Sequence, residues 1–326
     1  MISEIALYRG DSFDPHYNLA VEQYLLESVK EGQCILYLWQ NANTVVIGRN
    51  QNPWKECKTT LLEEEGGHLA RRLSGGGAVY HDLGNLNFTF LVPQADYDLD
   101  RQLEVIRQAA ALLGIKAEKT GRNDVTADGR KFSGNAFYKN GRQAYHHGTL
   151  LVDVDMSRMS RYLSPSKAKL QSKGVDSVRS RVVNLQELNP ELTVDSLADA
   201  LAQAFVNVYG GTLHTISKES LDSEAIEKLA QRNRSWEWNY GAKVAFTCSC
   251  EERFPWGGIE VSLQVDNGVI QQSKVYSDAM EWQIASALEN ALNGSRFTRE
   301  DLELRITAAD TDVNADLLSL LSQLGL

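Results

Sequence analysis

The sequence predicts an α+β fold of mixed sheets with flanking helices, followed by a smaller α+β unit. Short β-branched runs are joined by hairpin cues at Asp128-Gly129 and Asn140-Gly141, and type I′ turns of this kind need positive φ at both central residues. Helices are interspersed among these strands, which argues for layered α+β and against a Rossmann sheet. Residues 242–326 hold six Lys and Arg against 13 Asp and Glu, a net charge of −7 within a total of −10. We therefore expect two domains, residues 1–241 and 242–326.

Elements of the first 150 residues follow from caps and from β-branched runs. Asp14 is a good N-cap and Pro15 suits the first helical position. Residues 35–39 and 44–47 are short, β-branched-rich runs on either side of Asn-Ala-Asn. They favour two strands of one hairpin-based sheet. In chain order we expect a helix over 14–30, strands over 35–39, 44–47 and 87–92, a helix over 98–113 that ends at Gly114, and a strand over 131–138.

The second half of the chain continues with helices and then restarts with strands. A helix is expected to end before Gly210-Gly211, and Asn267-Gly268 marks another hairpin turn. The expected elements are helices over 193–209 and 219–232, strands over 244–247 and 259–265, a strand ending at Tyr276, and helices from about Asp278.

Composition limits the classes of function. The four cysteines lie at irregular spacing, and the sequence shows no signal-peptide pattern and no run of about 18 apolar residues. We therefore expect a cytoplasmic protein without a disulfide framework or a membrane partner. Nucleic acid is a poor candidate partner, because the net charge is −10 and no nucleic-acid-binding signature is visible.

Residues 71–85, RRLSGGGAVYHDLGN, carry the strongest sign of chemistry. Consecutive glycines let several backbone N–H groups converge on an oxyanion, and the two arginines add positive charge. Neighbouring side chains of a strand face opposite ways, so we expect only one of Arg71 and Arg72 to enter a site and the other to face solvent. The segment is not a P-loop, since no Gly-Lys-Ser/Thr follows. It is also not a dinucleotide fingerprint, because Tyr80 stands where the last glycine belongs.

A second group of motifs lies on three pieces of chain that two hairpins would bring side by side. They are GRND at residues 121–124, the run that starts at Lys131, and YHHGT at residues 145–149. Lys131 alone is also compatible with a surface lysine, and Asp124 with a turn residue. His146 and His147 are expected to point to opposite faces, which argues against a shared metal.

Residues 157–181 are basic against the acidic trend of the chain, with a single acid at Asp176. Such a run is usually a solvated face, but it could also close over a phosphate or meet an acidic partner.

Other catalytic templates fit poorly. Cys248-x-Cys250 lacks a nearby His or second Cys pair for zinc, and Ser74 is not in a G-x-S-x-G elbow. None of the cysteines lies in the glycine-rich, GRND or HHG segments, which weakens a cysteine acyl-enzyme mechanism.

In their order and separations, the motifs at residues 71–85, 121–136, 145–155 and 172–185 resemble the lipoate-protein ligase A family. The likeness extends from residues 17–26 and 45–57 to residues 234–241 and 252–260, and so covers nearly the whole chain. It implies a catalytic domain of the biotin/lipoate ligase fold and a small accessory domain. It also implies that lipoate and ATP give lipoyl-adenylate, and that the lipoyl group then passes to a lysine of an apo lipoyl domain in lipoate salvage.

The resemblance also implies partners and site residues. The acceptors would be E2 subunits of 2-oxoacid dehydrogenases and the glycine cleavage H protein. Lys131 would be the catalytic lysine and would contact both ATP and lipoate, and Asp124 would be a Mg²⁺ ligand or an orienter of Lys131. The expected ATP-binding residues are Arg72, Gly77, Ala78, Val79, Tyr80, Lys131, Lys173, Val178 and Arg179. The expected lipoate-binding residues are Ser74, Gly75, Gly76, Asn85, Lys131, Gly134, Ala136 and His147.

Three alternatives differ in specific features. An octanoyltransferase on this scaffold would use a cysteine near the core motifs and would usually lack the C-terminal unit. A biotin ligase would carry a G-R-G-R-R-G loop, which is absent. A non-enzymatic binding protein would not need Arg72, Lys131 and the glycines together. The preference for lipoate or octanoate, the first acceptor and the need for a helper protein stay open, and we expect a monomer.

Overall fold

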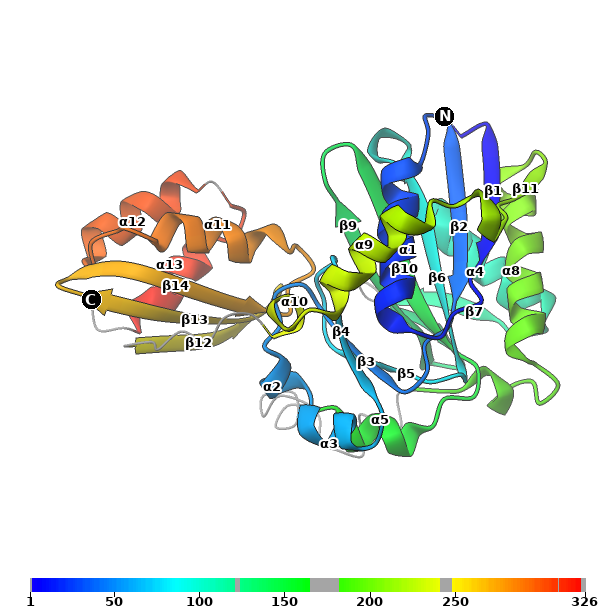
Figure 1. Cartoon of the computed structure of the whole chain (residues 1–326), viewed down its shortest axis with the longest axis horizontal. Coiled ribbons are helices and arrows are strands. Elements are labelled where there is room, and N and C mark those ends of the chain that lie inside the picture. The colour runs from blue at the N-terminus through cyan, green and yellow to red at the C-terminus, as the bar shows by residue number, and fades with distance from the viewer. Residues whose placement is uncertain (1, 121–123, 165–181, 241–247, 310, 324–326) are drawn as a thin grey trace.

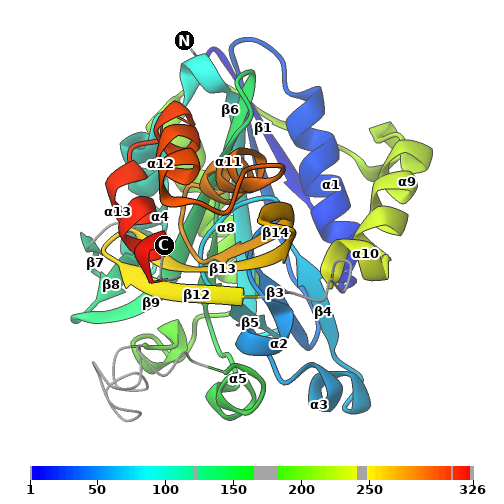
Figure 2. The same cartoon turned by 90° about the vertical axis from the view of Figure 1, so that its left-hand side faces the viewer.

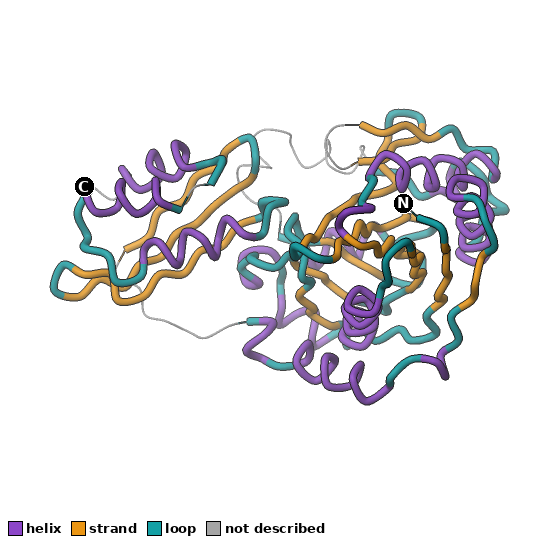
Figure 3. Tube along the Cα trace, turned by 90° about the horizontal axis from the view of Figure 1, so that it is seen from above, coloured by secondary structure: helices purple, strands orange, loops and turns teal. Residues whose placement is uncertain are grey.

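The computed structural model describes residues 2–120, 124–164, 182–240, 248–309 and 311–323. Two lobes lie side by side in Figures 1 and 3, the larger formed by the N-terminal part of the chain. The larger lobe contains an eight-stranded sheet and a three-stranded sheet, and the smaller lobe contains another three-stranded sheet with helices. The α+β class expected from the sequence is confirmed. None of the helices in the described ranges is both long and apolar enough to cross a membrane.

The large sheet is mixed. Its strand order is β11-β1-β2-β6-β10-β9-β8-β7; β1 pairs in parallel with β11 and β2, and the remaining neighbours pair antiparallel. The expected hairpins β8–β9 and β9–β10 are both present. The strands are β1 Glu4–Arg9, β2 Gln33–Trp39, β6 Asn85–Pro93, β7 Ala117–Thr120, β8 Asp124–Ala127, β9 Arg130–Lys139, β10 Gln143–Leu151 and β11 Leu213–Thr215.

The turns of these hairpins follow two different chemistries. Asp128 and Gly129 have φ values of +50° and +72°, as a type I′ turn requires. At the second hairpin only Gly141 has positive φ, so the type I′ expectation is wrong there. The Asn140 side chain instead accepts the amides of Arg142 and Gln143, which closes the turn by an Asx-type contact.

Side-chain alternation gives the large sheet two apolar faces. Ile5 and Leu7 of β1 pack in the cluster that includes α4 and α8, while Ala6 and Tyr8 pack in the cluster with α1 and α9. Figure 1 shows these helix pairs on opposite sides of the sheet. The helices are α1 Pro15–Ser28, α4 Leu99–Leu112, α8 Val194–Tyr209 and α9 Ser223–Arg234.

The observed helix ends follow their caps. The Asp14 carboxylate accepts the His16 amide at the start of α1, as expected. The helix expected over 219–232 begins later, because the Asp222 carboxylate accepts the amides of Glu224 and Ala225 and so caps α9 at Ser223.

The small sheet of the larger lobe corrects one expectation. Strands 35–39 and 44–47 do not form a hairpin, because β2 is already paired on both edges by β1 and β6. The chain turns away at Asn43, whose φ is +36°. The small sheet, in the order β4-β3-β5, consists of β3 Thr44–Ile47, β4 His68–Arg71 and β5 Val79–His81. Residues 72–78, here called the glycine loop, therefore connect two strands that flank β3.

Short helices surround the small sheet and complete the larger lobe. They are α2 Pro53–Glu56, α3 Thr59–Glu64, α5 Met156–Tyr162 and α10 Trp236–Asn239. The tip of α5 contributes Tyr162 to the buried cluster around β3 and β5.

The C-terminal lobe has its own core of buried aliphatic side chains from its sheet and helices. Asn267 and Gly268 have φ values of +49° and +74°, and the expected hairpin between β13 and β14 is confirmed. The strand expected over 244–247 and the boundary near Gly241 lie outside the described residues. The elements are β12 Cys248–Phe254, β13 Gly257–Asp266, β14 Val269–Ser277, α11 Gln283–Leu292, α12 Arg299–Ala308 and α13 Asn314–Ser322.

The C-terminal lobe contacts the larger lobe through its sheet and through the segment after β14. The Asn50 side chain donates to the Trp282 carbonyl over 2.7 Å, and the Trp282 ring stacks on Tyr138 of β9. Lys55 of α2 forms ion pairs with Glu251 and Glu260. Figure 2, viewed from the side of the C-terminal lobe, shows β12–β14 in front of the larger lobe.

Candidate functional site

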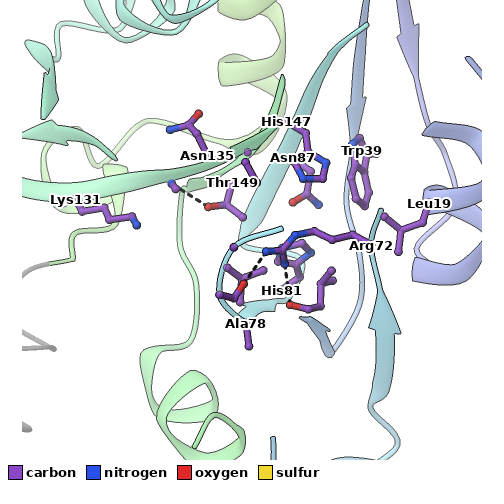
Figure 4. A pocket seen from close by; sticks show the side chains of 17 residues that line it. Leu19, Trp39, Arg72, Ala78, His81, Asn87, Lys131, Asn135, His147 and Thr149 are labelled. Atoms are coloured by element: carbon purple, nitrogen blue, oxygen red, sulfur yellow. Dashed lines mark hydrogen bonds between the residues drawn. The ribbon is translucent and has the colours of Figure 1, made fainter. Parts of the chain in front are cut away.

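A cavity of about 280 Å³ lies where the two sheets of the larger lobe meet. Its wall is formed by α1, β2, β3, β5, β6, β9, β10 and the glycine loop (Figure 4). The expected site residues that line it are Arg72, Gly76, Gly77, Ala78, Val79, Lys131, Gly134, Ala136 and His147. The hairpins therefore bring together motifs that are up to 75 residues apart in the chain.

Arg72 organises the glycine loop. Its Nε donates to Ser74 Oγ over 3.0 Å, and its Nη2 donates to the carbonyls of Gly75 and Gly77, each over 2.7 Å. Burial lowers the pKa of Arg72 to about 10, so the guanidinium still carries its charge at neutral pH. Arg72 thus supplies a fixed positive charge at the cavity, and its hydrogen bonds stabilise the conformation of the glycine loop.

Arg71 points to the opposite face, as strand alternation requires, but the expectation that it faces solvent is wrong. Only 8% of it is exposed. Its guanidinium donates to the carbonyls of the 48–51 segment and to those of Trp238 and Asn239 in α10. A second layer of chain covers this face, and Arg71 joins that layer to the sheet.

Lys131 and Asp124 form an ion pair at the edge of the cavity. Lys131 Nζ lies 2.6 Å from Asp124 Oδ1, and about a third of each side chain is exposed. A Cβ at Gly134 would lie 3.1 Å from Lys131 Nζ, so glycine at this position leaves room for the ammonium group. The contact supports the orienting role for Asp124. The described ranges contain no group of three or more His, Cys, Asp or Glu side chains suited to a metal.

His147 sits in a buried chain of hydrogen bonds. Its Nδ1 lies 2.8 Å from Glu22 Oε1, and its Nε2 lies 2.9 Å from Ser74 Oγ. A carboxylate only accepts, so Nδ1 carries a proton and donates to Glu22. Thr89 Oγ1 also donates to Glu22, and Trp39 Nε1 donates to Thr89. Sequence reasoning missed Glu22, although an acid directly after the apolar run Leu19–Val21 of α1 was a usable signal.

The other expected residues lie outside the cavity wall. The Tyr80 ring packs near Tyr162 in the core, and Asn85 is buried next to Asn87. A Cβ at Gly75 would lie 2.2 Å from the Ala279 carbonyl oxygen, so Gly75 faces the C-terminal lobe. Lys173, Val178 and Arg179 lie outside the described residues, as does most of the basic run after Ser157.

The polar cavity residues His81, Asn87, Asn135 and Thr149 were not among the expected site residues. On β6, Asn85, Asn87 and Thr89 alternate with Leu86, Phe88 and Phe90, which belong to the core. Polar residues at every second position of an otherwise apolar strand were the available signal.

The chemistry of the wall changes along the cavity. In Figure 4, Lys131 and Arg72 approach from opposite sides, while Leu19 and Trp39 lie beyond Arg72. Two cations next to apolar side chains suit a ligand with an anionic head and an apolar chain. The site can therefore stabilise charge on an activated acid.

Comparisons with known proteins agree with this arrangement. Residues 14–206 match the model of the lipoyl protein ligase A/B catalytic domain, and residues 243–320 match the bacterial lipoate protein ligase C-terminus. LipL1 of P. falciparum in complex with lipoate is 29% identical, with 97% of each chain covered and a TM-score of 0.84. A structure from an analysis of a bi-partite lipoate protein ligase and its E2 lipoyl domain from Thermoplasma acidophilum is 26% identical over 76% of this chain and 100% of its own, with a TM-score of 0.63. A lipoate-protein ligase A bound with ATP is 26% identical over 74% of this chain and 99% of its own, with a TM-score of 0.61.

Proposed function

The chain belongs to the lipoyl protein ligase A/B catalytic-domain family, and on that premise we propose that it is an ATP-dependent lipoate-protein ligase. In the first step the lipoate carboxylate attacks the α-phosphorus of ATP, and pyrophosphate leaves. In the second step a lysine amine of an apo lipoyl domain attacks the acyl carbonyl, and AMP leaves. The amine loses its proton as the amide forms.

The observation that carries this proposal is the meeting of Lys131, Arg72 and the glycine loop around one cavity with an apolar end. Both steps build negative charge on oxygen, which fixed cations and N–H donors stabilise. Lys131 would contact the α-phosphate and the acyl carbonyl, and Arg72 would lower the cost of bringing two anions together. Mg²⁺ would arrive with ATP, held mainly by phosphate oxygens. Asp124 is the candidate protein ligand, although its ion pair favours the orienting role.

Partners follow from the same proposal. Lipoate or octanoate would occupy the cavity, and the acceptors would be lipoyl domains of E2 subunits and the glycine cleavage H protein. We propose that a monomer carries out both steps in the cytoplasm, in lipoate salvage. Its catalytic domain would comprise residues 1–241 and its accessory domain residues 242–326.

Octanoyl transfer through a cysteine is the alternative. All four cysteines belong to the described part of the chain, and none lines the cavity. Burial raises the pKa of Cys57 to about 12 and raises the pKa of Cys34 as well. Raised thiol pKa values disfavour a thiolate nucleophile, and the match to a ligase C-terminus adds support for the ligase.

Lipoate-dependent exchange of labelled pyrophosphate into ATP tests the first step. Mass spectrometry of an apo lipoyl domain after incubation with lipoate and ATP tests the second step. The ligase is expected to require ATP in both assays. Transfer from octanoyl-carrier protein without ATP would instead establish the alternative.

A further inference from the structure

Lys131 lies beside a β-bulge. The register of the β8–β9 ladder shifts by one residue between Val125 and Thr126, so Phe132 is an extra residue on β9. Side chains alternate along a regular strand, which would put residues 131 and 134 on opposite faces. The bulge shifts this alternation by one residue, and Lys131 therefore reaches the cavity on the same side as Gly134.

The end of β9 that carries Lys131 is no longer paired with β10. The β9–β10 ladder runs from Asn135 to Lys139 of β9, and in the described stretch 124–164 no ladder pair joins β10 to residues 130–134. Two antiparallel strands without a third partner form a marginally stable unit. The position of Lys131 therefore depends on support from outside the β8–β9 hairpin.

Residues 182–187 supply this support. Val182 forms a parallel bridge with Lys131, and the Val183 amide donates to the Lys131 carbonyl over 2.9 Å. Val183 is fully buried and belongs to the same core cluster as Phe132. The segment thus occupies the edge of β9 that β10 leaves uncovered.

Hydrogen bonds hold this segment against the chain that follows β10. Asn184 Oδ1 accepts the amide of Val154, and Asn184 Nδ2 donates to the Val154 carbonyl, each over 3.0 Å. The Asn184 amide donates to Glu187 Oε1 over 3.1 Å, at the 3₁₀ turn Leu185–Glu187. Glu187 therefore has a fixed position relative to β10.

An ion pair joins this turn to the residue before Lys131. Arg130 Nη1 donates to Glu187 Oε2 over 2.8 Å, and this hydrogen bond lowers the pKa of Glu187, so the carboxylate is charged at neutral pH. Both side chains are partly exposed. An ion pair with this exposure adds little to global stability, and its main effect is on local geometry.

From these contacts we propose that Arg130 and Glu187 are positioning residues for Lys131. Their ion pair holds the Lys131 backbone beside residues 182–183, so that the ammonium group meets the α-phosphate and the acyl carbonyl. Asp124 orients the far end of the lysine side chain, whereas the ion pair fixes its backbone end. The inference deepens the proposed ligase function and rests on it. A displacement of about 1 Å at a reacting group can lower the rate by about 10²-fold.

Two substitutions remove the ion pair. Glu187→Gln keeps an acceptor for the Asn184 amide and loses the charge, and Arg130→Gln removes the cation. Glu227→Gln is the matched control, because Glu227 pairs with Arg234 over 2.7 Å on α9. The exposed side-chain fractions are 47% and 40% in this pair, against 49% and 36% for Glu187 and Arg130.

The rates of both half-reactions are the first readout. Glu187→Gln and Arg130→Gln should each slow adenylate formation, and transfer from supplied lipoyl-adenylate, by about 10- to 10²-fold. The double variant should be no slower than the slower single variant, since both changes remove the same pair. Glu227→Gln should react at the wild-type rate, and the urea midpoints of the three single variants should lie close together.

A combination with Lys131→Ala separates positioning from a general effect on the structure. If Glu187 acts through Lys131, Glu187→Gln should not slow the Lys131→Ala protein any further. A structural role alone would lower the rate by the same factor in both backgrounds.

Wild-type rates in both Glu187→Gln and Arg130→Gln would overturn the inference, as would an equal further loss in the Lys131→Ala background. If one of the two variants does not fold, the other decides the question. Failure of both to fold would also overturn the inference, because the pair would then serve the fold as a whole.

Hydrogen exchange gives a readout that does not depend on activity. The Val183 amide should exchange faster in Glu187→Gln than in the wild type or in Glu227→Gln. Unchanged exchange at Val183 would refute the positioning contact. A wild-type protein that is inactive in both half-reactions would instead refute the ligase proposal, so the two failures are distinguishable.

Discussion

The amide of Gly76 donates a hydrogen bond to the carbonyl of Ala279 over 3.0 Å, which joins the glycine loop to the C-terminal lobe. Gly76 has a φ of +87°, in the region that favours glycine. The neighbouring Gly75 has no room for a side chain because of the same Ala279 carbonyl. These glycines therefore serve the contact between the lobes, in addition to any role in binding an anion.

Gly75→Ala should separate the two lobes, because its Cβ would lie 2.2 Å from the Ala279 carbonyl oxygen. Small-angle scattering should show a larger radius of gyration than in the wild type. Gly114→Ala is the control, since Gly114 has a φ of +76° but no atom within 4 Å of the added Cβ. It should lower stability by about 1–2 kcal/mol, because a positive φ is unfavourable for a residue with a Cβ, and it should leave the scattering profile unchanged. An unchanged profile for Gly75→Ala would contradict this prediction, because it would show that the chain around Ala279 can shift to accept the Cβ while the lobes stay together.

Lys131→Ala should fold normally and lose both adenylate formation and acyl transfer. Removal of one preorganised electrostatic contact costs about 10²- to 10³-fold in rate. Lys139→Ala is a matched control on the same strand, because Lys139 is exposed and lies over the Tyr97 ring. Wild-type turnover by Lys131→Ala in either half-reaction would remove this lysine from that step.

Asp124 Oδ1 lies 2.6 Å from Lys131 Nζ and would hold the ammonium group in position. Asp124→Asn should therefore lower kcat by about tenfold, the typical effect of losing one charge-assisted hydrogen bond. The Mg²⁺ concentration that gives half-maximal rate should not change. A marked rise in that concentration, with kcat restored at high Mg²⁺, would identify Asp124 as a metal ligand instead.

Arg72→Ala and Arg71→Ala should differ in kind. Arg72→Ala should raise the apparent KM for ATP strongly, because it removes the charge at the cavity. Arg71→Ala should lower the free energy of unfolding by about 2–3 kcal/mol, because buried carbonyls lose their donor, with a smaller effect on KM. Denaturant titration and steady-state kinetics of both variants measure the two effects, and equal KM changes would contradict the assignment of faces.

A protein truncated after Tyr240 should keep acyl transfer from supplied lipoyl-adenylate and lose most of the first step. The C-terminal lobe contacts the glycine loop, so its movement between the steps would first complete and then open the site. Separate assays of the two half-reactions test this division of labour. Full adenylation by the truncated protein rules it out.

The protection of residues 167–182 is expected to rise when lipoyl-adenylate binds, because the basic run has few apolar residues of its own. All but the last of these residues lie outside the described ranges. Hydrogen exchange with and without the adenylate measures the change, and equal protection in both states would exclude closure over the ligand.

The sequence by itself determined the features that depend on neighbours in the chain. The Asp14 cap, the Asp128-Gly129 turn and the opposite facing of His146 and His147 all follow from local backbone geometry. Lys131 could be placed beside Asp124 for the same reason, because one tight hairpin joins β8 to β9.

Tertiary structure alone decided where strands and buried charges find their partners. β3 belongs to a different sheet from β2, because β1 and β6 already pair with both edges of β2. Arg71 is buried because it reaches the Trp238 carbonyl, 167 residues away. His81 Nδ1 likewise finds its partner, the side-chain amide of Asn41 at 3.1 Å, 40 residues away in the chain. Local preferences act within a few residues, whereas burial and hydrogen bonding are satisfied only by contacts that the complete fold assembles.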